Sequence, residues 1–220
     1  MTPTTPALDR ALNLARISLT FARVERVTRH EDGVRPETDT DHTVMLGLVA
    51  CDLAPAHLDR ARIAAFALVH DLVEVYAGDT QTLVISPEGA TAKRDREDIA
   101  RARLVAELGD GSWLAGLLAT YERQQEPEAR FVRLLDKVLP KLTHAFNGCG
   151  AALVLTDRPG FIDAHARQFQ KLREEYSEFP DALDLLWSSM LHAEGCWPSP
   201  EVRRTASALD AAPPAEGAVS

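Results

Sequence analysis

The feature that most constrains this chain is a histidine next to an aspartate, His70-Asp71, inside its most apolar segment, Ala65-Phe-Ala-Leu-Val-His-Asp-Leu-Val-Glu-Val-Tyr. An ionised carboxylate is costly to bury unless a cation or hydrogen-bond donors compensate its charge. A divalent metal ion would do so, because such ions accept imidazole and carboxylate ligands. This pair offers only two ligands, so a stable site needs others from elsewhere in the fold.

Two residues distant in the sequence are the best candidates to complete the site. His42 lies in Asp-Thr-Asp-His-Thr, and Asp136 lies in Phe-Val-Arg-Leu-Leu-Asp-Lys. With His70 and Asp71 they suit one ion of Mn, Co, Fe, Ni or Zn, or Mg, and leave positions for water and substrate. A His-Asp pair alone is common, and His42 alone is better interpreted as a polar residue near a helix cap. The metal hypothesis therefore depends on the four together.

The spacing of the apolar residues predicts an all-α fold. Helices are expected over about 7–27, 41–53, 58–76, 88–108, 111–125, 127–146, 160–177 and 180–193, with a polar loop over 28–39 and no strand-like alternation. Thr40 or Asp39 could cap the second helix, and Gly78 suits the end of the third. Pro140 is expected to kink or interrupt the helix just after Asp136.

Length and composition limit the domain organisation and the partners. The 220 residues suffice for one domain, so we expect a loose leader over 1–6, a helical domain over 7–204 and a disordered tail over 205–220. A net charge of −9 disfavours a long nucleic-acid partner, but not a small phosphorylated substrate. The absence of a long apolar run and of a signal peptide predicts a cytoplasmic protein without a membrane span. Three cysteines without CxxC spacing argue against disulfides and a cysteine zinc site: Cys51, Cys149 and Cys196.

Two carboxylates close to the pair are candidates for chemistry. Glu74 follows Asp71 by three positions, on nearly the same face of the predicted helix, where an acid or base is useful without ligating the metal. A solvated helix carboxylate is the alternative interpretation. Asp79 follows Gly78 at the end of that helix, where it could bind substrate hydroxyls or stabilise a turn.

The pattern His42…His70-Asp71…Asp136, with His-Asp-Leu-Val-Glu-Val-Tyr-Ala-Gly-Asp-Thr at its centre, resembles the HD-domain metal-dependent phosphohydrolases over residues 8–150. It is most similar to their 5′-deoxynucleotidase branch. The resemblance implies a helical bundle around a central metal-bearing helix, often dimeric, with these roles: metal ligands His42, His70, Asp71 and Asp136, catalytic carboxylate Glu74, sugar-binding Asp79, and phosphate-binding Arg26, with Arg23 as the alternative. Val27 follows Arg26 where the family usually has an aromatic residue.

The leading hypothesis is phosphate release from small nucleotides, specifically deoxyribonucleoside 5′-monophosphates. A deoxynucleoside triphosphate or an alarmone is an alternative substrate, although alarmone hydrolases usually carry Glu-Asp where this chain has Glu74-Val75. A nucleotide-binding regulator without turnover is a third reading. Cations that could serve a triphosphate are Arg29, Arg35, Lys137 and Lys141. Among other histidines, a packing role is favoured for His144 and an exposed loop position for His30.

Overall fold

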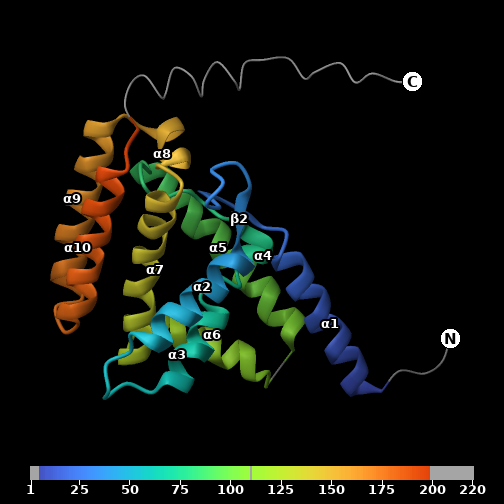
Figure 1. Ribbon diagram of the computed structural model, residues 1–220. Coiled ribbons are helices and arrows are strands. Elements are labelled where there is room, and N and C mark those ends of the chain that lie inside the picture. The colour runs from blue at the N-terminus through green and yellow to red at the C-terminus, as the bar shows by residue number, and fades with distance from the viewer. Residues whose placement is uncertain (1–4, 110, 199–220) are drawn as a thin grey trace, which may run out of the picture.

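The computed structural model describes residues 5–109 and 111–198, apart from the side chain of Ala151, and confirms the all-α fold class (Figure 1). The predicted tail over 205–220 and the leader up to residue 4 lie outside the described residues. Residues 5 and 6 already belong to the first helix, as its cap and its first residue. The described helices are α1 Pro6–Phe21, α2 Asp39–Asp52, α3 Arg60–Val69, α4 Glu74–Ala77, α5 Pro87–Leu108, α6 Trp113–Arg123, α7 Pro127–Phe146, α8 Gly150–Leu155, α9 Arg158–Glu175 and α10 Pro180–Gly195.

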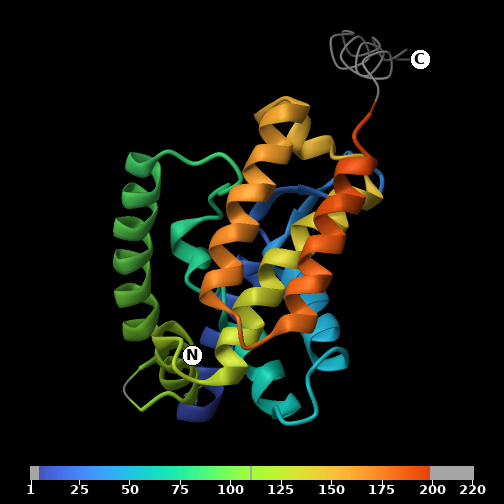
Figure 2. The same cartoon turned by 90° about the vertical axis from the view of Figure 1, so that its left-hand side faces the viewer.

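The helix α7 is the centre of the core. It packs against α10, α2 and α3, and its apolar face is fully buried at Leu134, Leu135, Val138 and Leu139. In Figure 2, α9 and α10 lie on one side of the molecule and α5 stands apart on the other, with α4 between them. The helix α5 reaches the rest of the fold mainly through α4, α6 and α1.

The first predicted helix is too long, because a small sheet follows it. The helix α1 ends at Phe21, and β1 (Glu25–Arg29) pairs antiparallel with β2 (Pro36–Thr38). The β-branched residues near β1 favour an extended strand, and β2 is too short to show alternation in the sequence. The hairpin therefore replaces the predicted polar loop, and its register places Glu25 opposite Thr38 at the start of α2.

The helix α2 begins earlier than predicted. Thr38 is its N-cap, not Thr40 or Asp39, and Thr38 and Asp41 form a reciprocal capping box. Asp39 and His42 consequently lie in the first turn, where both are buried, at 0% and 1% relative exposure.

The helix predicted over 58–76 is interrupted at the His70-Asp71 pair. The helix α3 ends at Val69, and backbone bonds from Leu72 to Val69 and from Glu74 to Asp71 have i→i+3 spacing. The shared α-helical face expected for Asp71 and Glu74 is therefore wrong. An i→i+3 turn nevertheless brings side chains three apart into line, so the two carboxylates still lie close together. Gly78 ends α4 at φ +71°, as predicted for a cap.

The helices predicted from residue 88 onward match the structure closely, with two differences. The helix α7 continues through Pro140 to Phe146, so the expected interruption does not occur. Proline lacks the amide hydrogen that would bond the carbonyl of Asp136, but packing on α10, α2 and α3 holds the helix. The short α8 was not predicted. None of the described helices has the length and apolarity to cross a membrane.

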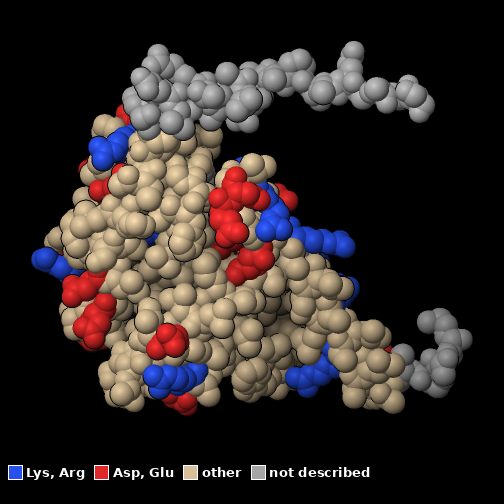
Figure 3. Space-filling model, in the orientation of Figure 1, with Lys and Arg blue, Asp and Glu red and all other residues tan. Residues whose placement is uncertain are grey.

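The described surface is mixed in charge. On the face in Figure 3, Lys and Arg side chains stand apart from one another and beside Asp and Glu. Exposed apolar side chains occur along α2, at Val44, Leu48 and Leu53. The expected homodimer stays a prediction.

Candidate metal centre and its cavity

Three separate segments bring the four predicted metal ligands together. His42 comes from α2, His70 and Asp71 from the turn after α3, and Asp136 from α7. His42 Nε2 lies 2.9 Å from Asp136 Oδ1, and His70 Nε2 lies 3.0 Å from Asp71 Oδ2. One ligand atom of each residue lies within 4.8 Å of those of the other three. The fold thus places two imidazoles and two carboxylates around one point.

Both imidazoles are oriented by a contact on their far nitrogen. His70 Nδ1 donates to the carbonyl of Ala67 at 2.8 Å, and His42 Nδ1 lies 3.3 Å from the buried carboxylate of Glu37. Such contacts set the tautomer and direct Nε2 at a metal. His70 Nε2 is buried, and although it lies 3.0 Å from Asp71 Oδ2, it makes no hydrogen bond of good geometry among the described residues. A buried nitrogen of this kind, aimed at two carboxylates, fits a divalent metal ion.

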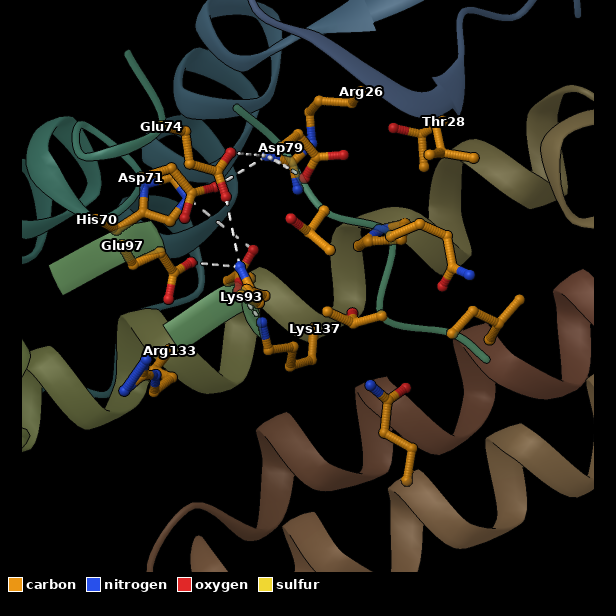
Figure 4. Close-up of a pocket in the computed structure, with 18 of the residues that line it drawn as sticks. Arg26, Thr28, His70, Asp71, Glu74, Asp79, Lys93, Glu97, Arg133 and Lys137 are labelled. Atoms are coloured by element: carbon orange, nitrogen blue, oxygen red, sulfur yellow. Dashed lines mark hydrogen bonds and ion pairs between the residues drawn. The ribbon is translucent and has the colours of Figure 1, made fainter. Parts of the chain in front are cut away.

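Arg26 on β1 links the four predicted metal ligands, called the metal cluster below, to other carboxylates (Figure 4). Its Nη1 lies 2.9 Å from Asp39 Oδ1 and from Asp71 Oδ2, and 3.9 Å from Asp79 Oδ1. Of the two arginines suggested for phosphate binding, Arg26 lines the cavity, whereas Arg23 is exposed in the turn between α1 and β1. Asp39 was missed as a site residue, because in the sequence it is one of several plausible cap residues.

Glu74 is buried beside this cluster, at 4% relative exposure. Burial, followed by the charges of Asp71 and Asp39, raises the pKa of Glu74 to about 11. Burial also acts to raise the pKa of Asp71, but His70 and Arg26 outweigh it and the net pKa is lowered. In the protein without a bound metal ion, Glu74 therefore holds a proton and Asp71 is ionised. The solvated-carboxylate interpretation of Glu74 does not fit this position.

One cavity of about 220 Å³ is lined by most of these residues: Arg26, His70, Asp71, Glu74, Asp79 and Asp136. Figure 4 shows Lys93 and Glu97 of α5 on the side of Glu74, where Lys93 Nζ lies 3.7 Å from Glu74 Oε1. Lys137 donates to Asp136 on the α7 side. Lys93 and Glu97 were also missed, since nothing in the sequence of α5 distinguishes them from a solvated helix face.

Some of the other predicted candidates line the cavity, and the others do not. Lys137 and Lys141 line the cavity, whereas Arg29 donates to the carbonyl of Val34 within the hairpin. His144 both lines the cavity and packs on the Phe161 ring, with centroids 5.7 Å apart. The residue Arg35 is exposed, and His30 contacts Asp41 at 3.2 Å.

A buried lysine lies at the end of the cavity away from the metal cluster. Lys141 is 4% exposed, and its Nζ donates to Gln168 Oε1 of α9 at 2.5 Å. Burial, reinforced by the charge of Lys137, lowers the pKa of Lys141 to about 7. Gln168 was missed because α9 is far from the motif in the sequence.

Comparisons with known proteins agree with the fold described above. The family model described as "HD domain" matches residues 21–177. The curated relatives include the 5′-deoxynucleotidase HDDC2 of Danio rerio, 28% identical over 57% of this chain and 65% of the relative, and that of Bos taurus, 28% identical over 58% and 64%. The chain thus spans slightly less than two thirds of their length. A crystal structure titled as a predicted metal-dependent phosphohydrolase, from Magnetospirillum magnetotacticum, shares the fold with a TM-score of 0.68 and 22% identity, over 90% of this chain and all of that one.

Replacing Lys141 by Met in the metal-free protein is expected to raise the free energy of unfolding at pH 7 by about 1–4 kcal/mol, because the buried charge is removed. The pKa of this lysine is about 7 in the folded chain against an ordinary 10.5. Between these values the unfolded chain binds more protons, so wild-type stability rises with pH and the advantage of Met shrinks. Urea denaturation from pH 7 to 10 measures this, with exposed Lys171→Met as the control. A destabilised variant, or a gain independent of pH, would contradict the assignment.

Proposed function

This chain belongs to the HD domain family, and on that premise we propose that it is a metal-dependent phosphohydrolase that releases phosphate from deoxyribonucleoside 5′-monophosphates. The observation that carries the proposal is the convergence of His42, His70, Asp71 and Asp136 on one point. The last three of these residues line a cavity that Arg26 and Glu74 also line. The names of the curated relatives support the choice of substrate.

The four clustered residues would hold one ion of Mn, Co, Fe, Ni or Zn, with Mg also compatible with the carboxylates. The chemistry supplied by a divalent ion at such ligands is acidification of water and neutralisation of charge on the phosphoryl oxygens. Glu37 supports His42 through Nδ1, and the carbonyl of Ala67 supports His70, so both rings are held in the orientation that ligation needs.

Arg26 and Lys137 are the cations that we assign to the phosphate. The hydrogen bonds of Arg26 to Asp39 and Asp71 involve Nη1, and a guanidinium has further N–H donors in a rigid fork that matches phosphate. Glu74 Oε2 lies 3.7 Å from Arg26 Nη1, so a phosphate held by Arg26 would come close to this carboxyl. We assign to Glu74 a role as acid or base. It either positions the attacking water or protonates the departing 5′ oxygen.

Asp79 is assigned to the sugar. Its carboxylate lies 3.9 Å from Arg26 and lines the same cavity, just after Gly78. A carboxylate in this position can accept hydrogen bonds from sugar hydroxyls next to a phosphate held by Arg26.

A triphosphate substrate has less support than a monophosphate. Of the four extra cations considered for it, Lys137 and Lys141 line the cavity, but Arg29 is engaged within the hairpin and Arg35 is exposed. A substrate screen that follows phosphate, pyrophosphate and triphosphate release separates the two. Nucleotide binding without any release would favour the regulator.

For the metal, we expect His70→Ala and Asp71→Ala to lose the ion, because neighbouring groups cannot replace a lost ligand. The Glu37→Gln protein should retain the ion with about 10- to 100-fold lower affinity, since Glu37 only orients His42. Elemental analysis and metal titration measure this, and the exposed His192→Ala is the control. Full occupancy in the protein that carries both alanine substitutions would reject the site.

For catalysis, Glu74→Gln is expected to keep the metal while kcat for deoxyribonucleoside 5′-monophosphates falls about 100-fold or more, because the proton transfer is lost. Phosphate release and metal content are measured on the same preparation. Glu31→Gln, in the exposed hairpin loop, is the control. Unchanged turnover in Glu74→Gln would return this residue to a structural role.

For the sugar, wild-type protein is expected to prefer 2′-deoxynucleotides over 2′,3′-dideoxynucleotides, which lack the 3′-hydroxyl. Asp79→Ala should reduce this preference, because the carboxylate left unpaired by the wrong sugar is removed. The ratio of kcat/KM values within one base series measures the effect, and exposed Asp95→Ala on α5 is the control. If the ratios in Asp79→Ala equal those of wild type, Asp79 does not read the sugar.

A further inference from the structure

The cavity extends beyond the metal cluster along the helix α7. Asp136 and Lys137 lie at the metal end, and Lys141 and His144 line the continuation. With a rise of 1.5 Å per residue, Lys141 lies about 7.5 Å and His144 about 12 Å along the axis from Asp136. A molecule that places its phosphate near Asp136 and extends along α7 therefore meets Lys141 with its other end.

The walls of this extension combine apolar side chains with polar groups, among them the imidazole of His144. Leu83 of the loop before α5, Leu155 at the end of α8 and Pro140 of α7 line it, and Lys141 and Gln168 supply polar atoms. Concave sites with apolar walls and a few polar atoms that fix orientation are typical of small-molecule binding. A flat heterocycle suits such a site.

The polar atoms that Lys141 and Gln168 present at this end are mainly hydrogen-bond donors. An ammonium or amine nitrogen that donates to Gln168 must face the amide oxygen, so the 2.5 Å contact from Lys141 Nζ fixes the orientation of the Gln168 amide. One of the two lone pairs of the amide oxygen is then engaged, and Nε2 is left with two donors. Lys141 keeps further N–H donors in the same place. The pair therefore offers a ligand more donors than free acceptor positions.

We propose that this end of the cavity binds the nucleobase, and that Lys141 and Gln168 select bases with a carbonyl over bases with an amino group at the corresponding position. The proposal rests on the proposed function, because it needs the phosphate at the metal end. A 4-keto pyrimidine or a 6-keto purine presents an acceptor to these donors. An amino group would face them with a second donor and leave buried groups unpaired, which disfavours binding about tenfold or more.

The test compares two pairs of nucleotides, dUMP with dCMP and dIMP with dAMP, which differ in the exocyclic keto or amino group and in the hydrogen on the adjacent ring nitrogen. Binding is measured by calorimetry on the metal-loaded protein carrying Glu74→Gln, and kcat/KM on the protein with Glu74 intact. We expect the keto member of each pair to bind about tenfold more tightly or better. Lys141→Met and Gln168→Leu should bring the members of each pair close to equal affinity. Lys171→Met, an exposed lysine on the helix of Gln168, is the matched control and should keep the preference.

A gain-of-function variant guards against simple misfolding. Gln168→Glu keeps the shape and the contact with Lys141 but offers an acceptor oxygen, so it should shift the preference toward dCMP and dAMP. Circular dichroism and thermal melting confirm that each variant is folded.

The inference is overturned if the protein with Lys141 and Gln168 intact binds both members of each pair with equal affinity. It is also overturned if the keto preference survives both Lys141→Met and Gln168→Leu. Its failure is distinguishable from failure of the proposed function. Phosphate release without keto preference rejects only the base subsite, whereas keto-selective binding without phosphate release rejects only the hydrolase.

Discussion

The contacts of Arg26 with buried carboxylates hold the candidate site together. Its Nη1 lies 2.9 Å from Asp39 and Asp71, and 3.7 and 3.9 Å from Glu74 and Asp79. These carboxylates come from α2, the turn after α3, α4 and the loop that follows it. Without a cation among them, the like charges would repel one another in a poorly hydrated place. One side chain from the hairpin thus allows several chain segments to converge.

The helix α7 packs into the core with one face and lines the cavity with the opposite face. One face is part of the main core, against α10, α2 and α3. The other carries Asp136, Lys137, Lys141 and His144 in order along the cavity. Since core packing fixes the rotation of the helix, it also fixes which of these side chains face the cavity and in what order. A continuous, packed helix therefore sets the spacing between the candidate metal centre and the far end of the site.

The sequence predicted the parts of this site that depend on local patterns. The His70-Asp71 pair, with the distant candidates His42 and Asp136, named the four residues that converge in the structure. The bounds of the helix over 127–146 were correct because Pro127 marks its start. Local patterns failed where tertiary contacts decide. The strand of Arg26 depends on pairing with β2. The contact between Lys141 and Gln168 joins residues 27 positions apart, which no local pattern reveals.

The metal cluster also joins distant parts of the chain. His42 and Asp136 are 94 positions apart, and their side chains meet at 2.9 Å. An unfolded chain would have to close a loop of this length before it could present both residues to one ion, and the entropy of that closure opposes it. Strong binding therefore belongs to the folded state alone. An ion bound there would act as a non-covalent crosslink between α2 and α7, and its free concentration would become one of the variables that set how stable the whole helical domain is.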